Sequence, residues 1–231
     1  MNDNSVRQGQ WQSMVGEFLA PILGGEAQAW AGANRAVIAG MFASQEAWEE
    51  RLSAAPDYAT FDYQYHLDWL CGMCRLVGVE PPSADESVKL GRRAGAAIMP
   101  RVHAAFPGAI EAIRLLHKRG YTLHTASGES STDLELYLDP MGVRDCFGRL
   151  YGPDLIGTFK NGPQFYERLL ADAEVAPADA LVLDDNPKCV GWAEEAGARS
   201  VLVSNALPTS QEATYVIARL ADLPGFIEQL Y

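Results

Sequence analysis

Residues 181–187 read Leu-Val-Leu-Asp-Asp-Asn-Pro, an apolar run that ends in two adjacent carboxylates. Residues 180–183 are predicted as a buried strand, and Pro187 starts a helical pattern that continues to about residue 196. Adjacent carboxylates at the end of an apolar strand are costly unless a positive group lies beside them, and their oxygens are ligands that suit Mg²⁺. Asp184 and Asp185 are therefore candidate metal ligands. Alternatively, one of them caps the following helix.

A lysine precedes this segment, just before another helical pattern. Residues 157–166 read Gly-Thr-Phe-Lys-Asn-Gly-Pro-Gln-Phe-Tyr, and Pro163 starts a helix that extends to about residue 173. Lys160 thus stands in the loop before a helix. An isolated lysine is usually a solvated surface charge, so a function for Lys160 depends on what lies near it.

A serine and a glycine follow a third apolar segment. The helix that opens at Pro107 ends at Gly120, and residues 121–126 are predicted as a strand that leads to Ser127 and Gly128. In open α/β sheets, ligands bind beyond the carboxyl ends of the strands. Ser127-Gly128, Lys160 and the two aspartates all occupy such places. Alternatively, Ser127 caps the helix that follows it.

Helical and strand-like segments alternate through the second half of the chain. Helical patterns at about 130–138, 163–173 and 187–196 are separated by strand-like residues 148–151, 180–183 and 200–203. This alternation predicts parallel βαβ units with right-handed crossovers. Residues 10–100 are expected to be mostly helical, and the pattern from Ser83 to Glu86 predicts a capping box there.

Composition limits the class of partner. The chain has 231 residues and a formal net charge of −12 at pH 7. Nucleic acids and anionic membranes need a basic surface, so neither is expected to bind, and a small-molecule substrate is expected instead. No apolar run approaches the roughly 18–20 residues that span a bilayer, and the N-terminus is polar, so a cytoplasmic location is predicted.

Two of the four cysteines have the spacing of a redox motif. Cys71 and Cys74 are separated by two residues, but they lie inside a helical apolar pattern and not at a strand-to-helix turn. Without a secretory segment, all four cysteines are expected to be reduced. The sequence therefore favours structural cysteines over a thiol redox protein.

The segments quoted above resemble the motifs of the haloacid dehalogenase (HAD) superfamily of hydrolases. Residues 106–109 and 120–128 are similar to the segment that carries motif II, residues 157–166 to motif III and residues 181–198 to motif IV. The resemblance implies an α/β fold, with a HAD-like Rossmannoid three-layer core, a parallel sheet and a helical cap domain. It assigns residues 15–100 to the cap and 101–231 to the core. Residues 1–14 are then a remnant of motif I and the start of the first helix.

The resemblance also implies a role for each candidate residue. Ser127 and the amide of Gly128 would hydrogen-bond a phosphoryl oxygen as charge builds in the transition state. Lys160 would neutralise both the nucleophilic carboxylate and the substrate phosphate, so it is a catalytic and a substrate-binding candidate. Asp184 and Asp185 would bind Mg²⁺, and Asp185 is the better match for the family's ligand.

The chain departs from the family pattern at motif I. No hydrophobic strand ending in Asp-x-Asp-x-Thr precedes the first helix. In the preferred register, Asp3 is the catalytic acid and base, and Met1 stands where the nucleophile belongs. In a second register Asp3 is itself the nucleophile, and in a third interpretation it is a terminal residue without a role. In the family this strand lies between those that lead to motifs II and IV, so the first core strand is expected to be missing.

The cap region contains many aromatic residues. In the family, caps shield the reacting centre from water and select the substrate. One group of side chains could face a substrate, or it could pack the interior of the cap: Tyr58, Phe61, Tyr63, Tyr65, His66 and Trp69.

Together these features predict a Mg²⁺-dependent phosphatase that acts on a small phosphorylated metabolite if a nucleophile is present, as a monomer or homodimer. The adjacent Asp184 and Asp185 favour the metal-using branch of the family, because its dehalogenases displace halide without a metal. Two alternatives stay open: a catalytically silent HAD-fold binding or regulatory protein, for which loss of the nucleophile is the expected signature, and a 2-haloacid dehalogenase-like hydrolase.

Overall fold

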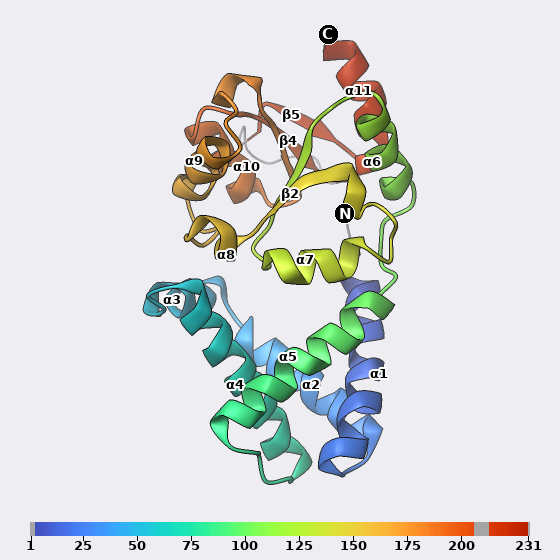
Figure 1. Ribbon diagram of the computed structural model, residues 1–231, viewed down its shortest axis with the longest axis vertical. Coiled ribbons are helices and arrows are strands. Elements are labelled where there is room, and N and C mark those ends of the chain that lie inside the picture. Colours follow the sequence, from blue (N-terminus) through green and yellow to red (C-terminus); the bar gives the residue numbers. More distant parts are fainter. Residues whose placement is uncertain (1–2, 206–212, 231) are drawn as a thin grey trace. The chain divides into compact units, whose positions relative to one another are not determined.

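The chain folds into two compact units, whose described residues are 3–104 for the first and 105–205 with 213–230 for the second. The computed structural model describes residues 3–205 and 213–230. The described part of the first unit is helical, and the second unit alternates helices with parallel strands (Figure 1). The predicted α/β fold with an added helical region is therefore confirmed.

The helical unit consists of five helices and one short 3-10 turn within residues 3–104. They are α1 (Asn4–Leu23), α2 (Ala27–Met41), α3 (Gln45–Ala54), α4 (Tyr58–Val77), α5 (Ala84–Ile98) and the turn η1 (Met99–Arg101). The predicted capping box is present at the start of α5, where the Glu86 carboxylate accepts a hydrogen bond from the backbone N–H of Ser83 at 3.2 Å. No helix in the described ranges is long and apolar enough to cross a membrane.

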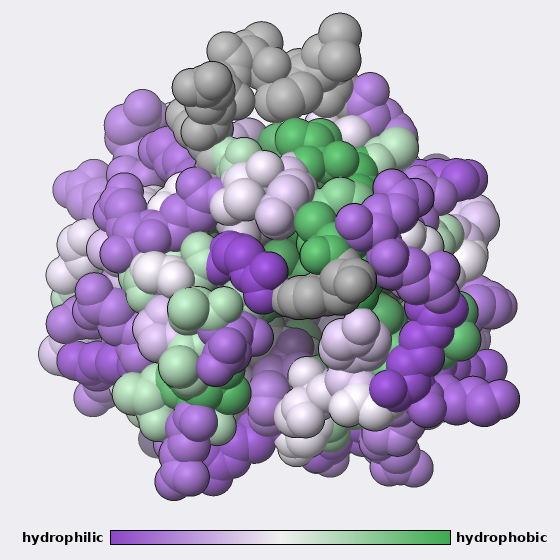
Figure 2. Space-filling view, turned by 90° about the horizontal axis from the view of Figure 1, so that it is seen from above, coloured by the Kyte–Doolittle hydropathy of each residue, from purple (hydrophilic) through white to green (hydrophobic). Residues whose placement is uncertain are grey.

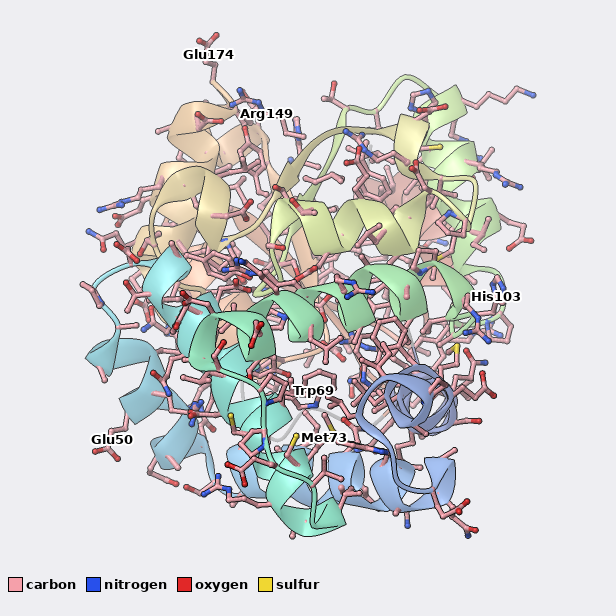
Figure 3. All side chains as sticks on the ribbon, turned by 60° about the horizontal axis from the view of Figure 1, so that its bottom comes forward. Glu50, Trp69, Met73, His103, Arg149 and Glu174 are labelled. Atoms are coloured by element: carbon pink, nitrogen blue, oxygen red, sulfur yellow. The ribbon has the colours of Figure 1, made fainter. Side chains whose placement is uncertain are left out.

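Two tryptophans organise the interior of the helical unit. Trp30 has no exposed surface and donates its indole N–H to the carbonyl of Gly24 at 2.8 Å. Trp69 donates to Oδ1 of the buried Asn34, also at 2.8 Å. Figure 3 shows Trp69 and Met73 among the helices of this unit. Because each indole N–H has an acceptor, burying these rings leaves no N–H without a hydrogen bond.

The α/β unit contains the remaining elements. Its helices are α6 (Ala109–Lys118), α7 (Ser131–Leu138), α8 (Pro153–Ile156), α9 (Pro163–Asp172), α10 (Pro187–Glu195) and α11 (Leu223–Leu230). Its strands are β1 (Leu123–Ala126), β2 (Phe147–Tyr151), β3 (Leu181–Asp184), β4 (Arg199–Val203) and β5 (Tyr215–Ile217). Short 3-10 turns are η2 (Arg144–Cys146), η3 (Pro177–Asp179) and η4 (Leu220–Asp222).

The strands form two separate sheets. β1 pairs with β2, and β3, β4 and β5 pair in that order, with every pairing parallel. Within residues 3–205 and 213–230, no strand pairs with the second edge of β1 or of β3. The expected parallel pairing is confirmed, and the described strands form two sheets.

Apolar side chains join the two sheets. Leu123 of β1 packs in the same cluster as Leu181 and Leu183 of β3. Ala126 of β1 and Val182 of β3 pack against a second cluster, which is built around α9 and α10. Since neighbouring residues of a strand point to opposite faces, the two clusters cover opposite faces of the sheets. The β1 and β3 strands are thus held in one unit by side-chain packing.

The surface of the protein is mixed in polarity. Figure 2 shows one face, with hydrophilic residues around its rim and hydrophobic residues toward its middle. The large apolar side chains that the α/β unit exposes include Leu115, Tyr121 and Val216. Single exposed apolar residues of this kind are normal on soluble domains.

A half-buried histidine links β1 to β2. Nδ1 of His124 accepts a hydrogen bond from the backbone N–H of Arg149 at 3.0 Å, so the ring is held neutral at this nitrogen. Arg149 in turn forms an ion pair with Asp172, which also accepts from the Tyr151 hydroxyl at 2.7 Å. Burial lowers the pKa of His124 below its ordinary value, and the positive charge of Arg149 adds to this effect.

This arrangement predicts that the protein loses stability in mild acid. A histidine whose folded-state pKa is lowered contributes stability that is fully present above its unfolded pKa of about 6.5 and is lost as the pH falls through the folded pKa. The His124→Gln variant, which keeps an acceptor but does not titrate, is expected to lose less unfolding free energy than the parent between pH 7 and pH 5. One proton accounts for at most about 1.4 kcal/mol per pH unit. Urea unfolding at both pH values measures the slopes, and equal slopes would contradict the prediction.

Candidate active site

Lys160 lies at the centre of the candidate site. Its ammonium donates to the carbonyl oxygen of Ala126, the last residue of β1, at 2.7 Å. It also donates to Oδ2 of Asp184, the last residue of β3, at 2.5 Å. The two side chains of this ion pair are only 12% and 11% exposed. The lysine therefore connects the carboxyl ends of two strands that belong to different sheets.

Ser127 is held in a tight turn directly after β1. Its backbone N–H donates to the carbonyl of Tyr151 at 3.0 Å, and its hydroxyl oxygen accepts from the N–H of Glu129 at 3.1 Å. The O–H group of Ser127 can therefore donate a hydrogen bond to another group. Gly128 is exposed, so its backbone is accessible from solvent. Ala126, whose carbonyl oxygen accepts from Lys160, directly precedes Ser127, so the serine turn begins next to the lysine contact.

Gly152 fixes the position of this turn. A Cβ atom on Gly152 would lie 2.1 Å from the carbonyl oxygen of Glu129, which is far inside contact distance. The backbone of the β2–α8 junction therefore packs directly against the turn that carries Ser127. Asp154 completes this packing by accepting from the backbone N–H of Ser131 at 2.9 Å, at the start of α7.

The two adjacent aspartates differ in their surroundings. Both oxygens of Asp184 are used, since Oδ2 accepts from Lys160 and Oδ1 accepts from the N–H of Asn186 at 2.9 Å. Asp185 is exposed. Among the described residues there is no group of three or more His, Cys, Asp or Glu side chains that could hold a metal. Mg²⁺ is often bound through one or two carboxylates plus substrate phosphate, and Asp185 fits that restricted kind of site.

Two buried polar groups lie next to the ion pair. Tyr166 is completely buried, and its ring centroid is 6.0 Å from the Lys160 ammonium, within the range of a cation–π interaction. Burial, followed by the neighbouring Cys189 and Asp184, raises the pKa of Tyr166. Its hydroxyl finds no nitrogen or oxygen partner in the described residues and lies against the thiol of Cys189. The sequence did not identify Tyr166 as a neighbour of Lys160, because the residue belongs to the ordinary apolar pattern of α9.

Asp3 belongs to the helical unit, whereas the other candidate residues belong to the α/β unit. Its carboxylate caps α1 by accepting from the N–H groups of Ser5 (2.9 Å) and Val6 (3.2 Å). The Ser5 side chain, followed by the Val6 amide, lowers the pKa of Asp3. The structure brings together Lys160 and Asp184, and it gives Asp3 a helix-capping position.

The cysteine pair has the environment of structural residues. Cys74 is fully buried, and Cys71 is partly buried in the same helix, α4. Burial, assisted by the neighbouring Cys71, raises the pKa of Cys74 to about 11. A redox-active thiol needs a lowered pKa, so this environment supports the structural interpretation.

Comparison with known proteins places these features in a family. A sequence model described as haloacid dehalogenase-like hydrolase matches residues 23–197. None of the curated proteins compared with the chain is similar enough in sequence to count as a relative.

Solved structures share the fold over nearly the whole chain. The defluorinating L-2-haloacid dehalogenase Rha0230 is 18% identical with a TM-score of 0.70, and the match covers 96% of this chain and 90% of that one. The L-2-haloacid dehalogenase from Xanthobacter autotrophicus is 17% identical with a TM-score of 0.62, covering 96% and 94%. A HAD phosphatase from Thermococcus onnurineus is 19% identical with a TM-score of 0.56, covering 96% and 91%. At such identities the likeness shows a common fold, and the reaction has to be argued from the site.

Proposed function

The chain belongs to the haloacid dehalogenase-like hydrolases, and from that premise we propose that it hydrolyses a phosphate monoester of a small metabolite. The observation that carries the proposal is the position of Lys160, which two oxygen atoms hold at the ends of β1 and β3. A cation fixed there, with a serine turn on one side and an exposed carboxylate on the other, suits a phosphate group. We also propose that the helical unit is the cap that selects the substrate.

Each residue of the site has a distinct part in this proposal. Lys160 attracts the substrate anion and is kept in place by Asp184. The Ser127 hydroxyl donates a hydrogen bond to a phosphoryl oxygen, and the backbone N–H of the exposed Gly128 supplies a second donor. Preorganised donors of this kind stabilise charge that develops in the transition state.

Asp185 is the proposed ligand for Mg²⁺. Asp184 is engaged by Lys160 and by the Asn186 amide, so it acts mainly by holding the lysine. When bound, Mg²⁺ would neutralise charge on the phosphate oxygens. The exposed carboxylate of Asp185 is placed to share such an ion with the substrate, at the end of the strand where ligands of α/β sheets bind.

A catalytically silent binding protein is the second candidate. One observation favours it: β1 and β3 belong to different sheets, and no described strand lies between them to carry a nucleophile. Such a protein would bind the same anion through Lys160 and Ser127 without turning it over.

The function is tested by assaying the full chain on an aryl phosphate and on L-2-chloropropionate, each with and without Mg²⁺. We expect phosphate release that requires the metal and no halide release. Asp185→Asn is expected to reduce turnover by at least about a hundredfold, because it removes the metal ligand. Asp179→Asn is the matched control, since this exposed carboxylate lies before the opposite end of β3 and should leave turnover unchanged.

Two other outcomes would each favour one of the alternative functions. Metal-independent halide release would establish the dehalogenase, and a folded sample that binds phosphate without releasing it from the ester would establish the silent protein. Asp3→Asn examines the proposal that Asp3 is the acid and base. Asparagine and aspartate are about equally good N-caps, so loss of turnover in this variant would report on the carboxylate and not on helix stability.

A further inference from the structure

A row of aromatic rings lies on the helical unit and includes none of the residues used in the proposed hydrolysis. The aromatic row consists of Phe42, Trp48, Tyr58, Phe61 and Tyr65. The ring centroids are 4.4 Å apart for Phe42–Trp48 and 5.5 Å for Trp48–Phe61. They are 6.1 Å apart for both Tyr58–Phe61 and Phe61–Tyr65. The rings come from the end of α2, from α3 and from α4, so separate helices combine to form one aromatic surface.

The aromatic row is not part of the buried core. Phe42 is 50% exposed, and the other four rings are only partly buried. Trp69, from the same aromatic-rich stretch of sequence, is different, because it is 3% exposed and its N–H is bonded to Asn34. The unit thus buries Trp69 almost entirely, while the rings of the aromatic row keep partial contact with solvent. Contiguous apolar surface that reaches solvent is a common feature of ligand-binding sites.

The charges around the aromatic row favour the binding of a cation over that of an anion. Helix α3, which supplies Trp48, carries three glutamates and a single arginine, at Glu46, Glu49, Glu50 and Arg51. That arginine is already paired with Asp68 at 2.6 Å. Phe42 is the C-cap of α2, where the backbone carbonyls concentrate the negative end of the helix dipole. Both features repel anions from the row and attract cations.

We propose that the aromatic row binds a small organic cation with a quaternary ammonium head. The negative face of an aromatic ring attracts a cation, and tryptophan does so most strongly. A quaternary ammonium has no N–H groups that would need acceptors, so an aromatic surface can replace its water shell. A metal ion or a protonated lysine would keep its water and gain less. The aromatic row shares no residue with the proposed phosphate site, and the proposal does not require hydrolysis.

The test compares choline with 3,3-dimethylbutan-1-ol, which has the same shape without the charge, by calorimetric titration of the full chain. Choline is expected to bind at least about tenfold more tightly than the neutral alcohol. Trp48→Phe and Trp48→Leu are expected to weaken choline binding in that order, the leucine variant to the level of the alcohol. Tyr121→Leu, which removes an exposed ring of the α/β unit, is the control and should bind choline normally.

Equal binding of choline and the alcohol would overturn the proposal in favour of a merely apolar patch, and absence of choline binding would overturn it outright. Unchanged choline binding in folded Trp48 variants would also overturn it. Circular dichroism establishes that each variant is folded, and the phenylalanine variant keeps a ring in place if the leucine variant does not fold. Because the titration contains no phosphate ester, its result is independent of the phosphatase assay.

Discussion

Lys160→Met is expected to lower the free energy of unfolding by about 3–5 kcal/mol. The substitution leaves the Asp184 carboxylate, which is 11% exposed, without the cation that neutralises it. It also removes the donor to the Ala126 carbonyl, so a connection between the ends of β1 and β3 is lost. Urea unfolding of the parent and the variant measures the difference.

A double-mutant cycle separates the ion pair from the packing of the lysine chain. Asp184→Asn in the Lys160→Met background removes the isolated charge and keeps an acceptor for the Asn186 amide, so most of the lost stability should return. The control is Arg219→Met, which breaks an exposed pair with Asp222 in the same unit and should cause no measurable change. Failure of Asp184→Asn to restore any stability would show that the buried charge is not the cause.

Gly16→Ala is the second substitution with a large expected effect. A Cβ atom on Gly16 would lie 2.2 Å from the carbonyl oxygen of Ala27, at the close approach of α1 to the start of α2. The obstructing atom belongs to the backbone, so it cannot rotate away as a side chain could. We expect a loss of about 3 kcal/mol in unfolding free energy, at the upper end of what overpacking costs.

Gly9→Ala is the matched control for this prediction. Gly9 lies in the same helix, and a Cβ there would meet no atom within 4 Å. Alanine is a better helix former than glycine by about 1 kcal/mol, so Gly9→Ala should stabilise the protein. The two variants share the change in helix propensity, and their opposite signs in thermal or urea unfolding would isolate the close approach. A loss of stability in Gly9→Ala would contradict the assignment of the Gly16→Ala effect to the close approach of α1 and α2.

The sequence predicted those parts of the site that local patterns determine. Ser127, Asp184 and Asp185 each follow an apolar run, and the end of a parallel strand is where such runs place polar residues. Lys160 was predicted from its position before the Pro163 helix. Their partners were not predictable, because the contact between Lys160 and Asp184 joins residues 24 positions apart and the contact to Ala126 is made by a backbone oxygen.

The secondary structure was predicted best where apolar periodicity is strong. The helix expected at about 163–173 is α9 (Pro163–Asp172), and the strand expected at 180–183 is β3 (Leu181–Asp184), one residue later. The strand expected at 121–126 starts only at Leu123. Helix α3 was not identified, since its glutamates hide the apolar pattern and Leu52 is its one buried residue. Strand β5, with three residues, is too short to give a period.

The lengths of the strands also bear on how copies of the protein could associate through their sheet edges. Two sheets have twice as many edges as one, and each edge offers unpaired backbone groups to another chain. Here every described strand has only three to five residues, so no edge can form a long ladder. The short strands therefore limit the length of backbone over which a second copy could add to these sheets.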